Sequence, residues 1–258
     1  MTKPFLKWVG GKTQILESVL AKFPKECNNY HEPFVGGGAA LLGMLSSECV
    51  IRDKIYASDS NRSLIALYKL VQSDPEKLIS GVNSHISGGF TEKDYYLMRT
   101  EFNKENDPIK FLILNKTCFR GLHREGPNGF NVPWGHYKKI SVMDEANIRQ
   151  VSELIRNVEF NCQSFEISLD SVLSGDFVYT DPPYVGTFDT YNKNGFGSDK
   201  HESLFSLVKS LPCPFVMSNS NDKLVLDSFK GYSIDTLVAR RAINSKNPGK
   251  TALEVLIN

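Results

Sequence analysis

The stretch YHEPFVGGGAALLGML, residues 30–45, indicates how this chain folds. A buried-strand pattern ends at 30–34, glycines occupy 36–38, and a helix-like run follows over 39–45. A strand, a glycine turn and a helix in this order open an α/β unit. Glycines at such a turn let a ligand approach the backbone and start a helix whose N-terminus favours anions. The stretch therefore predicts an α/β fold with a ligand site at this turn.

The common cofactor fingerprints do not match these glycines. The dinucleotide pattern G-x-G-x-x-G would need a glycine at Leu41, and a phosphate loop ending at residues 10–13 (GGKT) would need one at Leu6. Asp59, at the end of the next predicted strand, is placed to accept both hydroxyls of a ribose. A structural glycine turn and a helix-capping aspartate remain the alternatives for these two features.

Strands and helices alternate through most of the chain. A helix is predicted at 62–72, and further strands are predicted at 54–58, 157–162, 176–180 and 214–218. This alternation predicts a mostly parallel sheet with helices on both faces. The last two predicted strands, 232–239 and 252–257, are joined by a polar loop, so they predict an antiparallel hairpin at the sheet edge.

Residues 73–144 interrupt this alternation. The interruption is far longer than an ordinary α/β connection, so we expect it to form a structural unit of its own. Helices are predicted at 92–103 and 107–117, the second capped by Asp107 with Pro108 in its first turn, and a glycine- and proline-rich loop or hairpin follows. The predicted domains are therefore 1–72 with 145–258, and 73–144.

Composition excludes several classes of protein. The 41% of hydrophobic residues suffices for a packed core, yet no run of eighteen or more apolar residues and no signal-peptide pattern is present. The five cysteines include no C-x-x-C pair, which predicts neither a disulfide framework nor a zinc site. We expect no metal, no membrane partner and a reducing location inside the cell.

Positive charge is concentrated in three segments. Residues 1–12, 110–140 and 237–250 contain 13 of the 30 lysines and arginines but only one of the 29 acidic residues. If the segments meet in space, they form one positive face suited to a polyanion. Scattered, solvated side chains explain the charge pattern equally well.

The tetrapeptide Asp181-Pro182-Pro183-Tyr184 follows a predicted buried strand. The two prolines remove two backbone donors, keep their carbonyl acceptors and stiffen the chain. An aspartate and a proline carbonyl can accept the two N–H bonds of a flat amine, and a tyrosine ring can stack on its face. A proline turn at the surface is the alternative explanation for such a tetrapeptide in isolation.

Several motifs in fixed order resemble the Dam-type DNA adenine-N6 methyltransferases, over residues 5–257. They are 7–12 (KWVGGK), 32–38 (EPFVGGG), Asp59, 115–124 (NKTCFRGLHR), 130–139 (FNVPWGHYKK), 181–184 (DPPY), Ser218-Asn219 and Arg240-Arg241. The resemblance implies an α/β Rossmann-like S-adenosylmethionine-dependent methyltransferase sheet with an inserted, mostly helical target-recognition domain at 73–144. It also implies methyl transfer from S-adenosylmethionine to the N6 atom of an adenine flipped out of duplex DNA.

The resemblance also assigns roles to single residues. The catalytic residues would be Asp181, Pro182, Pro183 and Tyr184. Lys12 would pair with the methionine carboxylate of the cofactor, and Asp59 would bind its ribose. The full cofactor set would be Trp8, Gly10, Lys12, Phe34, Gly36, Gly38, Asp59, Phe165 and Asp181.

The DNA-binding residues implied by the resemblance lie mainly in the interruption. Phe119 would insert into the duplex, Arg124 would read a guanine, and Lys7 would lie near the first base pair of the site. The full set is Lys7, Asn115, Phe119, Arg120, Leu122, His123, Arg124, Pro133, His136, Lys138, Lys139, Arg240 and Arg241.

Departures from the family pattern affect the recognition sequence. The departures all lie within residues 115–139, here called the reading segment. They are at Thr117, Cys118, Arg120, His123 and His136. We expect the site GATC, with another site containing GA as the alternative. Double-stranded DNA is the expected partner, and a cognate restriction endonuclease is a further one. We expect the protein to act as a monomer on one site. Its expected location is the cytoplasm or wherever that DNA resides.

Three alternatives to adenine-N6 methylation of DNA fit the sequence less well. Methylation of an amine on protein or RNA could use the same acceptor-rich corner, but the basic segment with an aromatic residue favours duplex nucleic acid. Cytosine-C5 methylation needs a cysteine nucleophile, and Cys213 is expected to be buried at the start of a strand. A catalytically silent DNA-binding module is the last alternative, which the intact 181–184 motif disfavours.

Overall fold

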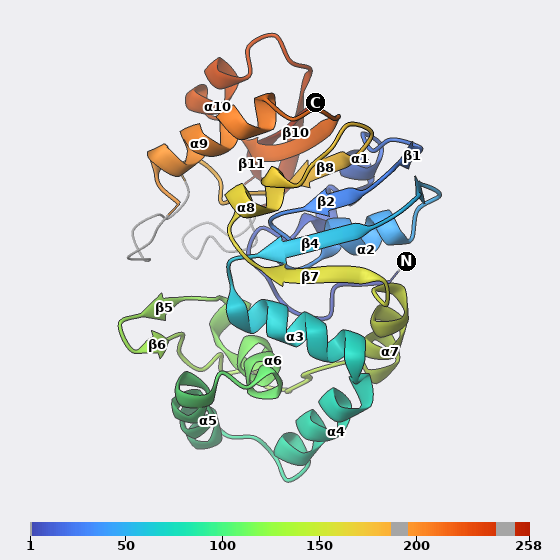
Figure 1. The fold of residues 1–258 in the computed structure, drawn as a ribbon. Coiled ribbons are helices and arrows are strands. Elements are labelled where there is room, and N and C mark those ends of the chain that lie inside the picture. Colours follow the sequence, from blue (N-terminus) through green and yellow to red (C-terminus); the bar gives the residue numbers. More distant parts are fainter. Residues whose placement is uncertain (1, 187–195, 241–250) are drawn as a thin grey trace.

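A seven-stranded sheet forms the centre of the protein, in a computed structural model that describes residues 2–186, 196–240 and 251–258. The strand order across the sheet is β10-β11-β9-β8-β2-β4-β7 (Figure 1). The strands are β2 (Tyr30–Glu32), β4 (Ile55–Asp59), β7 (Val158–Cys162), β8 (Phe177–Thr180), β9 (Phe215–Ser220), β10 (Ile234–Arg240) and β11 (Thr251–Ile257).

Five of these strands are parallel, which confirms the predicted type of sheet. β11 pairs antiparallel with both β9 and β10, so the predicted terminal hairpin lies at one edge. β9 continues to Ser220, beyond the predicted end at residue 218, so Ser218 and Asn219 both lie within this strand.

Alternating side chains divide the interior into two layers. In β8, Phe177 and Tyr179 face one core, whereas Val178 faces the other. The first core packs against α1 (Leu16–Leu20), α2 (Ala39–Leu45), α3 (Arg62–Ser73) and α7 (Glu145–Leu154). The second packs against α8 (Phe165–Asp170), α9 (Ser198–Lys209) and α10 (Lys223–Ser228). Since successive strand residues point to opposite faces, the predicted α/β layering follows directly from this apolar run.

The chain reverses its direction across the sheet between β2 and β8. From β2 it proceeds outward through β4 to β7, and it then returns to β8 on the other side of β2 and proceeds outward to β9. Such a reversal leaves a crevice outside the carboxyl ends of the two central strands, where ligands bind in open α/β sheets. The residues that follow β2 and β8 are the glycine turn 36–38 and the tetrapeptide 181–184.

The inserted segment is built largely of helices. It contains α4 (Pro75–Ile86), α5 (Glu92–Glu105), α6 (Pro108–Thr117) and a short hairpin of β5 (Glu125–Gly126) with β6 (Gly129–Phe130). Figure 1 shows these helices as a lower lobe, with α3 between them and β7. The predicted helices at 92–103 and 107–117 are confirmed, and α4 is an additional helix capped by Asp74. Apolar side chains of this segment are continuous with the first core.

The structure also bears on the burial of Cys213 and on membrane-spanning helices. Cys213 was expected to be buried at the start of a strand, but it is partly exposed in the turn before β9, because the strand begins only at Phe215. Within the described ranges, no helix combines the length and apolar character that crossing a membrane requires.

A buried aspartate fixes the two central strands at their amino ends. Asp176, just before β8, accepts hydrogen bonds from the backbone and side-chain nitrogens of Asn29 at 3.1 and 2.8 Å, from the backbone of Leu173 at 2.9 Å, and lies 2.9 Å from Nε2 of His31. Burial alone would raise the pKa of Asp176, but these donors outweigh it and lower the pKa. Burial also lowers the pKa of His31, so its ring is neutral at pH 7.

We predict that Asp176→Ala lowers the free energy of unfolding by about 2–4 kcal/mol at pH 7, because it leaves several buried donors without an acceptor. Urea denaturation measures this, with Asp227→Ala on the exposed side of α10 as the matched control. A depressed carboxyl pKa stabilises the fold above the ordinary aspartate pKa of about 4, and that stabilisation disappears at lower pH. The difference between variant and parent should therefore shrink below pH 4, and a constant difference would contradict the account.

Candidate active site and nucleic-acid interface

Asp181 is the central charged group at the carboxyl end of β8. Its Oδ2 atom lies 2.6 Å from Nζ of Lys12, which is buried in the short 3-10 helix η1 (Lys12–Gln14). Burial raises the pKa of Asp181 to about 6; Lys12 opposes this shift, whereas Glu254 adds to it. The carboxylate is therefore a strong acceptor that loses its charge in mildly acidic solution.

Lys12 and Tyr184 complete the arrangement around this carboxylate. Nζ of Lys12 also donates to the carbonyl oxygen of Gly10 at 2.6 Å and lies 4.9 Å from the centre of the Tyr184 ring. The hydroxyl of Tyr184 donates to Oε2 of Glu254 in β11 at 2.8 Å. The predicted residues Gly10, Lys12, Asp181 and Tyr184 are thus brought together, although they come from opposite ends of the chain.

Three buried polar atoms near the ends of β8 and β9 have no hydrogen-bond partner among the described residues. They are Oγ1 of Thr180, Oδ1 of Asp181 and Nδ2 of Asn219. Buried polar atoms normally have partners, and an unpaired one destabilises the fold. Two atoms that can accept and one that donates are therefore available for a polar ligand at this end of the sheet.

The glycine turn packs under Trp8 and against Asp59. Gly36 has φ +46°, and a Cβ atom there would lie 2.9 Å from the Trp8 ring; at Gly38, with φ +73°, it would lie 2.4 Å from the Tyr68 hydroxyl. The backbone N–H of Gly36 donates to Oδ2 of Asp59 at 3.2 Å. Burial raises the pKa of Asp59, against the opposing effect of its backbone donors. Trp8, the glycines and Asp59 thus form one wall beside Asp181.

Aromatic side chains lie beyond this wall. Phe34 and Phe165 stack with their ring centres 5.6 Å apart, and Phe196 packs against both. Phe165 was expected to contact a cofactor, but its ring is buried in the second core, so Phe34 is the more accessible of the two. Phe165 thus supports Phe34 from behind.

Lys7 connects the amino-terminal segment to the inserted segment. The side chain of Asn115 accepts from the backbone nitrogen of Lys7 at 2.9 Å and donates to its carbonyl at 2.7 Å. Nζ of Lys7 donates to the carbonyl of Lys116 and lies 4.1 Å from the centre of the Tyr137 ring. Asn115 itself was expected at the DNA, but it is buried and both bonds of its amide hold Lys7. Two of the three basic segments therefore meet in space.

His123 lies between the two parts of the molecule. Its ring stacks on Trp8 at 5.5 Å, contacts Phe111 and Phe130, and lies within 3.2 Å of Nδ2 of Asn61, two residues beyond Asp59. Burial lowers the pKa of His123 to about 4, so it is neutral at pH 7. Sequence reasoning placed this ring at the DNA, and in the structure it contacts the Trp8 wall and the core of the inserted segment.

The rest of the reading segment is more exposed. Phe119 is 40% exposed, so it is not a buried core residue at the end of α6. Arg120, at φ +57°, places its guanidinium over the Phe119 ring, and Arg124 donates through Nε to Oδ1 of Asn131 at 2.6 Å across the hairpin. The carbonyl of Pro133 accepts from the backbone of Phe119 at 2.8 Å, and Leu122 is half-buried. These residues form one edge beside the hairpin.

The remaining predicted DNA-binding residues differ in how they are placed. His136, Lys138 and Lys139 are exposed. Arg240 ends β10, and Arg241 lies outside the described residues. Figure 1 places the hairpin on the side to which β4 and β7 point, so the reading segment and the carboxyl ends of the strands share one side of the molecule.

Three further residues had no assigned role in the sequence. Glu254 contacts Tyr184, and Glu32, buried in β2, accepts from the Tyr30 hydroxyl at 2.6 Å. Burial raises the pKa of Glu32 to about 8. Lys116 has a pKa lowered to about 8 by burial and by Lys7 beside it. Lys116 could have been found from the basic segment. The contact of Glu254 with Tyr184 joins distant parts of the chain, and the burial of Glu32 depends on the position of β2 inside the sheet.

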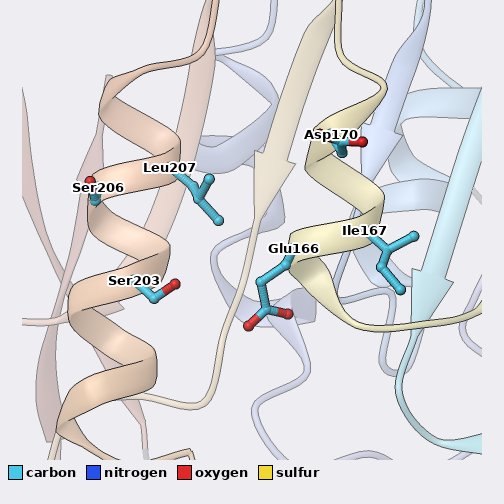
Figure 2. Close-up of a pocket in the computed structure, with 6 residues that line it drawn as sticks. All are labelled: Glu166, Ile167, Asp170, Ser203, Ser206 and Leu207. Carbon is cyan, nitrogen blue, oxygen red and sulfur yellow. The ribbon is translucent and has the colours of Figure 1, made fainter.

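A shallow cavity of about 630 Å³ lies elsewhere, between α8 and α9. Figure 2 shows Glu166 and Leu207 directed into the space between these helices. The other lining residues are Ile167, Asp170, Ser203 and Ser206, and none of the candidate site residues lines it. Its two carboxylates, Glu166 and Asp170, make it unsuited to a polyanion.

Comparisons with known proteins agree with this geometry. The family of D12 class N6 adenine-specific DNA methyltransferases matches residues 8–243. The Type II methyltransferase M.MjaIII of Methanocaldococcus jannaschii is 38% identical, covering 95% of this chain and 93% of that protein. The DNA adenine methylase of Escherichia coli K12 is 30% identical, covering 99% and 94% respectively.

Among solved structures, the rRNA methyltransferase aviRa of Streptomyces viridochromogenes aligns with a TM-score of 0.40 at 16% identity, over 95% of this chain and 82% of that chain. The family match covers nearly the whole chain, including the glycine turn, Lys12, Asp181 and Tyr184. The chain belongs to the D12 class of N6 adenine-specific DNA methyltransferases.

Proposed function

We propose that this protein methylates N6 of a flipped-out adenine in duplex DNA, with Asp181, the Pro182 carbonyl and the Tyr184 ring holding that base. The observation that carries the proposal is the partly buried Asp181 carboxylate, whose buried Oδ1 has no partner among the described residues and whose Oδ2 lies on Lys12. An adenine amine can reach this corner only outside the base stack. The amine would donate to the carboxylate and to the carbonyl, which directs its lone pair away from both acceptors.

S-adenosylmethionine is the proposed cofactor, and the residues present fit it. When bound, it supplies the electrophilic methyl group. Asp59, whose carboxylate takes only backbone donors from the described residues, would accept the ribose hydroxyls. Lys12 would bind the methionine carboxylate, while Trp8 and Phe34 would cover the apolar parts. The glycines at 36 and 38 keep the turn free of side chains, and the unpaired polar atoms of Thr180 and Asn219 add further capacity.

Positioning supplies the catalysis in this proposal. The prolines stiffen the loop, and Pro182 is buried while Tyr184 is held at its hydroxyl. Holding the reacting groups in the correct geometry removes much of the entropic barrier to reaction. No covalent intermediate and no metal is required of the residues at this corner.

Residues 73–144 are proposed as the target-recognition domain, with GATC as the site. Phe119 is exposed enough to enter the stack and fill the space left by the adenine, as apolar wedges do in other DNA-bending proteins. Lys7 and Arg124 would read bases, while His136, Lys138, Lys139 and Arg240 would bind phosphates and set the register. Direct reading by Arg124 requires its guanidinium to leave Asn131 or to use its remaining donors.

A cognate restriction endonuclease is a proposed partner. The relative from M. jannaschii bears a Type II methyltransferase name, which supports this partner for the present chain. We propose that the protein acts as a monomer on one site. Loss of protection of host DNA after deletion of the methyltransferase gene, in cells that keep the nuclease, would test the pairing.

We predict that Asp181→Ala lowers the methylation rate at least about 100-fold, because the amine loses its main acceptor and its alignment. Transfer of labelled methyl groups to an oligonucleotide duplex measures this rate. Asp170→Ala, on the exposed side of α8, is the matched control and should retain activity. Near-parental methylation by the folded Asp181 variant would overturn the proposed mechanism.

The pKa of Asp181 near 6 predicts a pH dependence. Below pH 6 the carboxyl is protonated and loses an acceptor, so kcat/KM should fall about tenfold for each further pH unit. Measurements between pH 5 and 8, with the melting temperature followed in parallel, separate this effect from unfolding. A flat profile across this interval, with the fold intact, is the contrary outcome.

Arg124→Ala should cost about 1–3 kcal/mol of discrimination and relax the preference at one base pair, because a bidentate guanine contact is lost. Competition between duplexes with single-base changes measures it. Lys139→Ala is the comparison: it should weaken binding to every sequence and reduce the salt dependence by about one charge. If the Arg124 variant methylates all the duplexes in the same proportions as the parent, Arg124 does not read a base. Its side chain would then contact a DNA phosphate or lie in solvent.

A further inference from the structure

The Tyr184 side chain is held by a residue far away in the chain. Its hydroxyl donates to Oε2 of Glu254, 70 residues later, at 2.8 Å. Nζ of Lys12 lies over the ring at 4.9 Å from its centre. The next residue, Val185, is fixed too: its backbone nitrogen donates to Oδ1 of Asn219 at 3.3 Å, and its carbonyl accepts from Ser220 at 2.9 Å. Both the ring and the backbone after it are therefore anchored to the sheet.

Glu254 is itself rigidly placed. In β11 it pairs with Ser220 of β9 on one side and with Leu237 of β10 on the other, so its backbone lies in the interior of the sheet. Its neighbour Val255 points into the second core. Within the described ranges, no lysine or arginine forms an ion pair with Glu254, although a half-buried carboxylate is stabilised by such a partner. The tyrosine hydroxyl is its observed hydrogen-bond donor.

We propose that Glu254 is a positioning residue for methyl transfer, which sets the orientation of the Tyr184 ring on which the target adenine stacks. The inference rests on the proposed role of Tyr184 at the adenine. A tyrosine ring turns about two side-chain torsions. The bond at its hydroxyl fixes the direction of the ring axis, and with it the first torsion, while the Lys12 ammonium over one face restrains rotation about that axis. Since the Lys12 ammonium lies over the ring, the stacking base would take the opposite face.

The negative charge of Glu254 suits this role. An ionised carboxylate can only accept, so the tyrosine must donate, and hydrogen bonds to an ionised acceptor are the stronger ones. Glu254 also contributes to raising the pKa of Asp181, which places the two carboxylates in one electrostatic environment. Rotation of an untethered ring would reduce the fraction of molecules that can receive the base.

A double-mutant cycle tests the proposal in the full-length protein. Glu254→Ala and Tyr184→Phe each remove the same bond from opposite ends, so each should lower kcat/KM about tenfold. The double variant should be no worse than either single variant. Glu254→Gln keeps an acceptor at the same position and should recover most of the activity. Thr236→Ala, on the exposed face of β10, is the matched control.

A second readout separates positioning from stability. With 2-aminopurine at the target position, loss of stacking on Tyr184 should make the bound DNA more fluorescent in Glu254→Ala and in Tyr184→Phe. A lower melting temperature with unchanged fluorescence would mean a structural role and overturn the proposal. Additive losses in the double variant would also overturn it. Should Glu254→Ala not fold, Tyr184→Phe alone tests the bond, since the ring is retained.

Tyr184→Ala distinguishes this inference from the proposed function. If Tyr184→Ala methylates adenine at the parental rate, the stacking role of Tyr184 is wrong and the function proposed for this corner must change. If Tyr184→Ala is impaired while Tyr184→Phe and Glu254→Ala remain within twofold of the parent, the base stacks on the ring but Glu254 does not position it.

Discussion

The reversal of strand order between β2 and β8 is the constraint on which the rest of this structure depends. Parallel strands present their carboxyl ends at one edge, and only at a reversal do the outgoing connections separate and leave room there. The glycine turn after β2 and the tetrapeptide after β8 occupy the two sides of that gap. Lys12 joins them from the amino-terminal segment through its bond to Asp181. The order of the strands therefore decides where in the fold these two segments meet.

The amino-terminal segment carries the second structural link. Lys7 and Trp8 are adjacent, yet Lys7 is bound by Asn115 of α6 and Trp8 packs on the glycine turn and on His123. Helix α6 of the inserted segment also packs on α3, and the segment shares the first core. The inserted segment and the candidate site around Asp181 are therefore held together by buried contacts, and no long exposed linker separates them within the described residues.

Sequence reasoning succeeded where the chemistry is local. The cap at Asp107 depends on neighbouring residues, and the alternation of strands and helices was enough for the sheet. The role of the tetrapeptide at 181–184 stays a prediction. Sequence reasoning failed where distant strands meet. The bond from Tyr184 to Glu254 follows from the pairing of β11 with β9, which no short pattern contains. Sequence reasoning likewise did not indicate that the amide of Asn115 holds the Lys7 backbone or that the Phe165 ring lies in the core behind Phe34.

The position of His123 has a consequence for how enzymes of this kind diverge. A side chain whose contacts are all with DNA can change freely when a new recognition sequence is favoured, whereas the His123 ring packs on Trp8 and contacts Asn61 beside the Asp59 loop. A substitution at residue 123 alters the wall around Asp59 as well as the hairpin. Drift in specificity should accordingly accumulate at exposed neighbours such as Arg120 and Asn131, while residue 123 changes only together with its partners.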